Sequence, residues 1–195
     1  MRKVLVVAML AVALSAGSAF AAEKLSYNFA QASYVDAEFD SGPDGDGVSL
    51  FGVGEVSQRF HLFGMYETIE FDGGLLGDAD FDTLQAGFGY HRDLGDRASF
   101  YGRVSYVDVD VDTIIGSGSD DGFGLTAGAR GLISPKVELN AELAYVDLGD
   151  IGDDTTLGFN AFYNATEKFS VGLGYRTSDL IDAFNVSLRF YWGER

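Results

Sequence analysis

Apolar residues alternate with polar or small residues, segment after segment, from Leu25 to Trp192. Each segment has about ten residues, a length suited to a membrane-crossing strand, and ends in a turn-forming stretch. Because successive side chains of an extended strand point to opposite faces, a period of two separates an apolar face from a mixed face. The pattern therefore predicts an all-β fold built from amphipathic strands.

Five segments show this alternation clearly. Their apolar positions are Leu84, Ala86, Phe88 and Tyr90; Phe100, Gly102, Val104 and Tyr106; Val137, Leu139, Ala141, Leu143 and Tyr145; Phe169, Val171, Leu173 and Tyr175; and Phe184, Val186, Leu188, Phe190 and Trp192. Five further segments fit less cleanly, at 25–35, 47–56, 60–70, 122–132 and 155–163. In segment 25–35 the apolar face changes between Phe29 and Ala30, and a bulge is one way to switch the register there.

The connections between the segments differ in length. Four are tight, at 57–59, 93–97, 134–136 and 165–168, and five are longer, acidic and glycine-rich, at 36–46, 72–80, 108–121, 147–154 and 177–182. Short turns on one side and long loops on the other are typical of outer-membrane barrels. Nine connections join ten strands, an even number that lets the first and last strands pair antiparallel. Eight strands is the alternative, and it requires two patterned segments to be loops.

The N-terminus has the three parts of a secretory signal peptide. Arg2 and Lys3 form a positive region, Val4 to Leu14 is apolar, and Ala19-Phe20-Ala21 is an A-x-A cleavage site. The apolar run is too short to span a bilayer as a helix. We therefore expect residues 1–21 to be a cleaved signal peptide and residues 22–195 to form the barrel, which leaves 195 − 21 = 174 residues.

The chain is strongly acidic, with a formal net charge of −17. Losing Arg2 and Lys3 with the signal peptide would make it −19. Such a charge repels nucleic acid and excludes a DNA-binding role, whereas divalent cations would be attracted. Because the chain contains no cysteine, no disulfide framework holds it together after export.

The aromatic residues favour lipid over water as the surroundings of the apolar face. They gather at both ends of the strands, as in the two aromatic girdles of a membrane barrel. Those beside the short turns are Phe60, Tyr90, Phe100, Tyr163, Phe169 and Trp192, and those towards the long loops are Tyr66, Tyr106, Phe123, Tyr145, Tyr175 and Phe184. Since every backbone polar group in lipid needs an internal partner, the sheet must close. The prediction is thus a closed antiparallel up-and-down transmembrane β-barrel, with a periplasmic sandwich as the alternative.

Charged residues on the mixed face are expected to fill the lumen. They are Arg103, Arg130, Arg176 and Arg189, with Glu55, Glu67, Glu138 and Glu142 as candidate partners. Hairpin geometry makes Arg130 and Glu138 inward neighbours and places Glu55 near His61. Pairing Tyr90 with Phe100 would set His91 opposite Ser99 and Gly87 opposite Arg103. Either these charges form an ion-pair network that plugs a narrow barrel, or they are ordinary hydrated lumen charges.

Catalytic and metal motifs are weak. The only two histidines, His61 and His91, lie beside short turns, whereas barrel proteases and deacylases place catalytic histidine near the outer side. No Cys nucleophile, G-x-S-x-G motif or metal-spaced histidine cluster is present, so we predict neither an enzyme nor a cofactor. Acidic loop residues are weak candidates for loosely bound Ca²⁺ or Mg²⁺, alone or shared with lipopolysaccharide phosphates. These candidates are Asp44, Asp46, Asp108, Asp110 and Asp112. The last three alternate with valines and are expected to line one face of a protruding strand.

Several short motifs resemble those of small bacterial outer-membrane β-barrels. They are Leu25-Ser26-Tyr27-Asn28-Phe29, Phe60-His61-Leu62-Phe63-Gly64, Gly87-Phe88-Gly89-Tyr90-His91 and Ser134-Pro135-Lys136-Val137. In the wider sense the chain resembles the OmpA-like barrels, and in particular the small barrels once described as activators of plant immunity. The resemblance implies an outer-membrane barrel and implies no activity. One departure is that Trp192 is followed by Gly193-Glu194-Arg195, whereas such barrels usually end on an aromatic residue.

Taken together, these features predict a non-enzymatic protein of the bacterial outer membrane with a structural or surface-interaction role through its acidic loops. A narrow, cation-preferring pore is the first alternative, and a barrel enzyme acting on lipid or peptide is the second. The expected partners are outer-membrane lipid and lipopolysaccharide, with the barrel assembly machinery and periplasmic chaperones during biogenesis. We expect the barrel to be a monomer.

Overall fold

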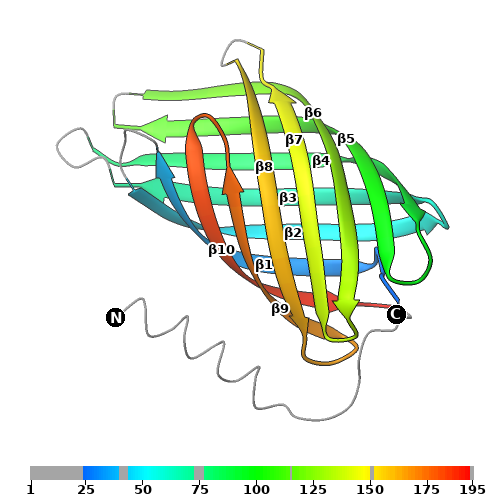
Figure 1. The fold of residues 1–195 in the computed structure, drawn as a ribbon. Helices are drawn as coiled ribbons and strands as arrows, with labels where there is room; N and C mark the ends of the chain where they lie inside the picture. Colours follow the sequence, from blue (N-terminus) through cyan, green and yellow to red (C-terminus); the bar gives the residue numbers. More distant parts are fainter. Residues whose placement is uncertain (1–23, 40–43, 73–76, 115, 150–151, 194–195) are drawn as a thin grey trace.

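The computed structural model describes residues 24–39, 44–72, 77–114, 116–149 and 152–193. They form ten strands in chain order (Figure 1). The strands are β1 (Phe29–Phe39), β2 (Asp44–Ser57), β3 (Phe60–Phe71), β4 (Ala79–Asp93), β5 (Ala98–Thr113), β6 (Gly116–Ser134), β7 (Val137–Asp147), β8 (Asp153–Asn164), β9 (Phe169–Thr177) and β10 (Ile181–Tyr191). The prediction of ten strands rather than eight is confirmed.

Each strand pairs antiparallel with its neighbours in the sequence, and β1 pairs with β10, so that the sheet closes into a barrel. The closing register aligns Phe29 with Tyr191 and Phe39 with Ile181 over the full length of both strands. Closure removes the open sheet edges that a bilayer does not tolerate. No helix among the described residues is long and apolar enough to cross a membrane.

The two faces of the sheet have the composition that the alternation predicts. Leu84, Phe88, Phe100, Leu143 and Leu188 are each more than half exposed on the outer face. Both sets of predicted girdle aromatics also lie on this outer face, because they occupy the same alternate positions of their strands. The inner face carries the buried polar and charged side chains. The apolar face therefore points away from the lumen, which is the arrangement of a barrel in lipid rather than in water.

Tight turns lie at one end of the barrel, between β2 and β3, β4 and β5, β6 and β7, and β8 and β9. In the β4–β5 turn, the NH of Leu94 donates to the carbonyl of Ala98, and Gly95 has a φ of 76° that favours glycine. We call this end the short-turn end and the opposite end the long-loop end.

The long connections are shorter than the sequence predicts, because the strands continue into them. The predicted loop 108–121 is instead a β-hairpin in which Thr113 pairs with Gly116. Likewise β1 continues to Phe39 and β2 starts at Asp44, so most of the predicted loop 36–46 is strand. The acidic and glycine-rich composition of these segments suggested loops, but paired neighbouring strands supply their backbone hydrogen bonds.

The N-terminal segment also differs from the prediction. β1 begins at Phe29 rather than at residue 25, and its odd-numbered residues face the lumen throughout, without a register switch. Residues 25–28 enter the barrel at the short-turn end, where Leu25, Ser26 and Tyr27 are all buried. The mixed face pattern in segment 25–35 therefore arises because residues 25–28 are a buried segment outside the sheet and the strand begins only at Phe29.

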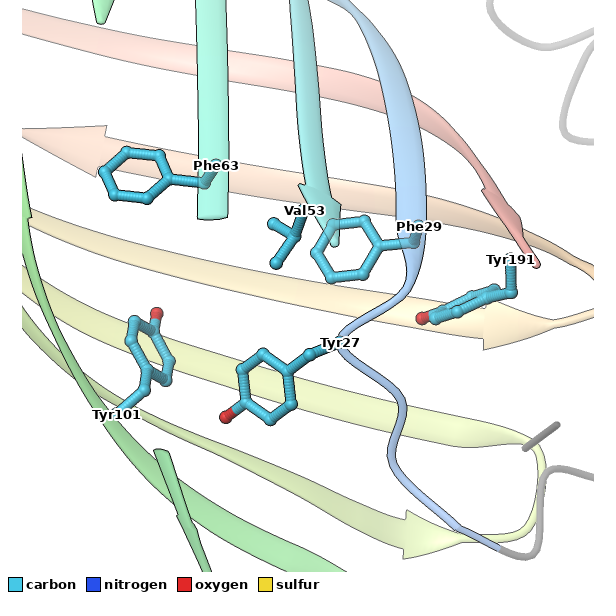
Figure 2. Close-up of a cluster of buried hydrophobic side chains, with 6 residues drawn as sticks. All are labelled: Tyr27, Phe29, Val53, Phe63, Tyr101 and Tyr191. Carbon is cyan, nitrogen blue, oxygen red and sulfur yellow. The ribbon is translucent and has the colours of Figure 1, made fainter. Parts of the chain in front are cut away.

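The two larger apolar clusters of the described residues lie inside the lumen, one towards each end, and Leu25 packs separately against Leu132. The first contains Tyr27, Phe29, Val53, Phe63, Tyr101 and Tyr191 at the short-turn end (Figure 2). The second contains Val35, Ala37, Ile69, Phe71 and Ala183 at the long-loop end, with Phe39, Phe81 and Ile181 packed against it. Polar and charged side chains fill much of the space between and beside them.

Candidate functional site

Glu138 is the centre of an ion-pair network in the lumen. Its Oε1 accepts from Nη2 of Arg130 at 2.7 Å and from Nη1 of Arg189 at 3.1 Å. Its Oε2 accepts from the Tyr191 hydroxyl at 3.2 Å. Glu138 is completely buried, so one carboxylate is held by two guanidinium groups and a phenol away from water. The structure thus places Arg130 and Glu138 in contact, as the hairpin geometry predicts, and adds Arg189.

The two arginines of this network have further partners that fix their planes. Arg189 donates twice to Oε1 of Gln31, at 2.8 and 3.0 Å, and its guanidinium carbon lies 3.6 Å from the Phe162 ring centroid. Arg130 donates to the backbone carbonyl of Ser26 at 3.0 Å. Cation–π contact and full hydrogen bonding both stabilise a buried guanidinium. Because Ser26 lies in the N-terminal segment, the network also ties that segment into the barrel.

Tyr27 fills the short-turn end of the lumen. Its ring stacks on His91 with centroids 3.9 Å apart and on His61 with centroids 4.9 Å apart. Its hydroxyl lies 2.9 Å from that of Ser99, and Figure 2 shows the ring reaching across the interior towards Tyr101. The two histidines are themselves 3.3 Å apart between their Nδ1 atoms. Together these rings form a stacked aromatic plug.

Among the described residues, Arg103 contacts aromatic rings and a histidine rather than the carboxylate partner that the sequence suggests. Its guanidinium carbon lies 4.4 Å from the Tyr101 ring centroid, 5.1 Å from that of Phe51 and 5.2 Å from that of Phe63. Its Nε donates to Nε2 of His61 at 3.3 Å. Glu142, a predicted acidic partner, instead accepts from the Tyr101 hydroxyl at 2.6 Å. Three aromatic rings thus surround the guanidinium group and provide cation–π contacts in place of an ion pair.

The remaining predicted lumen charges, Arg176, Glu67 and Glu55, lie outside the Glu138 network. Arg176 and Glu67 form a two-pronged ion pair with distances of 2.6 and 3.0 Å, separately from Glu138. Glu55 pairs with His61 in register, as predicted, but its carboxylate lies 3.7 Å from His91 and bonds to the Asn28 amide. Glu55 is exposed at the short-turn end, so its contacts are weak compared with those of Glu138.

The predicted β4–β5 register is wrong by two residues. Tyr90 pairs with Gly102 and His91 with Tyr101, so the glycine opposite Arg103 is Gly89 rather than Gly87. A Cβ atom at Gly89 would collide with the His61 ring and with the Arg103 side chain. The principle that a glycine gives the arginine room is therefore correct, but the glycine was misplaced because the centre of the β4–β5 hairpin lies one residue further along the chain than predicted.

Carboxylates gather on the outer face at the long-loop end. Five of them lie opposite one another across consecutive strands: Asp36 with Asp46, Asp46 with Glu70, Glu70 with Asp80, and Asp80 with Asp112. We call these five residues the acidic row. Asp110 faces Asp82 and Asp108 faces Asp121 on the neighbouring positions.

The five candidate metal ligands all lie on paired strands, as expected for Asp108, Asp110 and Asp112 from their alternation with valines. Asp44 and Asp46 are in β2, and Asp108, Asp110 and Asp112 are in β5. Within the described residues, no group of three or more His, Cys, Asp or Glu side chains is close enough together to hold a metal ion. Their spacing suits shared, loose neutralisation by cations more than a coordination cage.

Sequence reasoning missed the aromatic and amide partners of the network. Tyr27, Phe162, Tyr191 and Gln31 all contact its charged groups, yet none carries a charge that singles it out. One available signal was that Tyr191 falls on the lumen side of the last strand, alternating with Phe190 and Trp192. Tyr27 gave no such signal, because it precedes the first strand.

A closed ten-stranded barrel with a lipid-compatible exterior and a charged interior defines an outer-membrane β-barrel protein. The sequence model of the outer membrane protein β-barrel domain matches residues 4–176, and the chain belongs to this family. Membership places the protein in the bacterial outer membrane. Among curated proteins, no sequence matches the chain.

Solved structures share the fold at low sequence identity. The KdgM porin in complex with disordered oligogalacturonate is 10% identical, with a TM-score of 0.52 over 84% of this chain and 99% of that one. The translocator domain of the autotransporter NalP from Neisseria meningitidis is 11% identical, with a TM-score of 0.50 over 84% and 87%. The attachment invasion locus protein Ail of Yersinia pestis is 13% identical, with a TM-score of 0.43 over 84% and 95%. At such identities the likeness is one of fold alone.

Proposed function

We propose that this protein is a non-enzymatic, non-conducting barrel that acts through its acidic outer surface at the cell exterior. The acidic row carries the proposal. Like charges placed directly opposite each other across strands destabilise a sheet, and here the arrangement repeats over five neighbouring strands. A cationic partner would relieve this repulsion, and the acidic row is therefore suited to binding one.

Candidate partners at this height of the barrel are Ca²⁺ or Mg²⁺ shared with the phosphates of lipopolysaccharide, and cationic segments of other proteins. Hard divalent cations bind carboxylate and phosphate oxygens. The acidic row lies on the face that carries the girdle aromatics and beyond them along the strands, so it would meet the polar head groups rather than the acyl chains. The row thus suits attachment to the charged layer of the outer leaflet.

The interior supports the non-conducting part of the proposal. The aromatic plug and the Glu138 network occupy the short-turn end of the lumen, where Tyr27, His61 and His91 are all nearly inaccessible. The histidines are also far from the long-loop end at which an enzyme acting on external lipid or peptide would need them.

The proposal is tested by comparing cation responses of the unfolding free energy. A row-neutralised variant (Asp46→Asn, Glu70→Gln and Asp80→Asn) should be more stable than the unchanged protein without divalent cations. Addition of Mg²⁺ at constant ionic strength should stabilise the unchanged protein and have little effect on the variant. A matched control removes three charges at the short-turn end (Asp93→Asn, Asp96→Asn and Glu167→Gln) and should keep the Mg²⁺ response. Equal Mg²⁺ responses in all three proteins would contradict the role of the acidic row.

Single-channel recording of the refolded mature protein in a planar bilayer tests the lumen. A silent, correctly inserted barrel is expected. Stable cation-selective steps would instead establish the narrow-pore alternative and overturn the non-conducting proposal.

A further inference from the structure

Among the described residues, the first part of β6 has a neighbouring strand on one side only. Its pairing with β5 begins at Gly116, opposite Thr113, but its pairing with β7 begins only at Phe123, opposite Asp147. Figure 1 shows this part of β6 continuing past the end of β7 towards the β5–β6 hairpin. Residues 116–122 therefore form a stretch of sheet edge that extends beyond β7 at the long-loop end. We call it the β6 edge.

Alternate residues of a central antiparallel strand bond to its two neighbours. At the short-turn end, the NH of Leu132 donates to the carbonyl of Arg97, so the even-numbered residues of β6 bond towards β5. The odd-numbered residues 117, 119 and 121 therefore direct their backbone groups towards the open side. Asp120 already accepts from the NH of Asp121 at 2.9 Å. Ser117 and Ser119 receive no ladder partner on that side from β7 in the described part of the chain.

The side chains around this edge leave the backbone accessible. A Cβ added at Gly118 would meet nothing within 4 Å, and Ser117 and Ser119 are both small and exposed. Gly149, in the described part of the β7–β8 connection, lies beside Asp120 and thus reaches the edge at 120–121. Proteins usually protect an exposed edge with charged side chains, Pro or a bulge. Asp120 and Asp121 lie at the end of 116–122 nearest Gly149, and residues 116–119 contain none of these features.

The surrounding charge is negative. Asp108, Asp110 and Asp112 lie on the adjacent strand β5 and face away from the lumen, and Asp121 faces Asp108. A second copy of the chain would bring the same carboxylates together, so its pairing at this edge is disfavoured. A strand with Lys or Arg at alternate positions would bring the opposite charge to the same face.

From the open edge and its charge, we infer that the β6 edge binds an extended basic segment of a partner protein by β-strand addition. Backbone hydrogen bonds to Ser117 and Ser119 provide the attachment, and the carboxylates of β5 and Asp121 select basic side chains. The inference deepens the proposed surface-interaction function by naming a partner class for one part of the acidic surface.

The experiment uses the full mature protein in zwitterionic nanodiscs and a fluorescent ten-residue peptide that alternates Lys with Thr. Anisotropy measures binding. A second peptide of the same sequence carries an N-methyl group on every backbone amide, which removes the NH donors from both edges of the extended peptide but keeps every charge. We expect the unmodified peptide to bind at least tenfold more tightly than the N-methylated one. Equal binding would overturn the inference.

Two variants locate the binding on the barrel. Ser119→Pro removes an open-edge NH without removing a bond to β5, because proline is tolerated at edge positions. It should weaken binding of the unmodified peptide at least tenfold, whereas the matched Ser119→Ala variant should not. Unchanged binding by Ser119→Pro would place the peptide elsewhere and overturn the inference.

A third variant separates the failure of this inference from the failure of the proposed function. Replacing Asp110 and Asp112 by Asn should weaken both peptides if charge contributes. Binding that depends on these carboxylates but not on the N-methyl groups or on Ser119 would leave an acidic interaction surface and reject the strand addition. An absence of binding by either peptide would also reject it, and the Mg²⁺ response of the acidic row would remain the test of the proposed function.

Discussion

Glu138 neutralises two buried arginine side chains in the lumen. Its carboxylate is the shared partner of Arg130 and Arg189, and the side chains of Glu138 and both arginines are nearly inaccessible to water. A buried ion pair is weak evidence of net stabilisation, but removing one partner leaves an uncompensated charge. In this network the loss of one carboxylate would leave two guanidinium groups with only neutral partners.

The variant Glu138→Gln should therefore lower the unfolding free energy by about 3–5 kcal/mol, the range for breaking a buried ion pair. Urea titration in lipid vesicles, followed by the fluorescence of Trp192, measures the change, because this is the single tryptophan of the chain. Glu55→Gln is the control, since Glu55 is exposed and its loss should cost no more than about 1 kcal/mol. Similar losses in both variants would show that Glu138 has no special role.

Gly89 and Gly52 form a second test at the residue scale. A Cβ at Gly89 would collide with His61 and Arg103, whereas one at Gly52 on the outer face would meet nothing within 4 Å. Gly89→Ala should therefore cost about 1–3 kcal/mol of unfolding free energy, as overpacking does. Gly52→Ala should be close to neutral in the same urea titration. The reverse order would show that Arg103 and the histidines repack freely.

At the scale of elements, the N-terminal segment acts as part of the lumen rather than as a strand. Tyr27 stacks on two histidines, and Ser26 accepts a hydrogen bond from Arg130, so the segment is bound by contacts with β3, β4 and β6. These contacts close the short-turn end without adding a strand to the barrel.

The variant Tyr27→Ala should open this end. Removing the ring leaves a gap beside His61 and His91, and we expect a rise in single-channel conductance over that of the unchanged protein. Truncation of a buried aromatic side chain also costs about 3–5 kcal/mol, so the unfolding free energy should fall. Tyr90→Ala removes an outward-facing girdle ring and should leave conductance unchanged. Equal conductance in all three proteins would mean that the Glu138 network alone blocks ion passage.

The strands themselves were largely predictable. Period-two alternation identified ten segments in the correct order, because a barrel in lipid requires one apolar face along every strand. The ends of the strands at the long-loop side were not predictable in the same way. There the strands leave the apolar layer and their outer face becomes acidic, as at Asp108, Asp110 and Asp112, so the outward-facing apolar positions that mark the other strands are missing. Residues 108–121 thus read as a loop although they form a paired hairpin.

At the scale of the whole molecule, the barrel has one orientation. The four tight turns and both described ends of the chain lie at the short-turn end, and the acidic row lies at the other. Barrels of the outer membrane keep short turns in the periplasm and longer connections outside. The β5–β6 hairpin should therefore be exposed on the cell surface.

Single cysteine variants can test this orientation, because the chain has no cysteine of its own. A membrane-impermeant maleimide should label Ser117→Cys in intact cells. It should label Gln58→Cys, in the β2–β3 turn, only after the outer membrane is permeabilised. Labelling of Gln58→Cys alone in intact cells would reverse the orientation and remove the acidic row from the exterior.

Which side chains meet inside the lumen depends on register and on the closure of the barrel. Arg130 and Glu138 were predictable because a short hairpin joins their strands, so that few registers were open to them. Arg189 reaches Glu138 only because β10 closes onto β1, and Arg176 meets Glu67 across the lumen, 109 residues away in the sequence. No local pattern encodes such contacts.

The sequence by itself determined the fold class, the number of strands, the lipid-facing residues and the acidic character of the exterior. The first three follow from the local alternation, which the surrounding lipid requires, and the acidic character follows from composition. Only the tertiary structure decided that Tyr27 enters the lumen, that aromatic rings rather than carboxylates hold Arg103, and that β6 extends past β7. These features arise from contacts between strands far apart in the chain, where tilt, register and side-chain shape determine which groups meet.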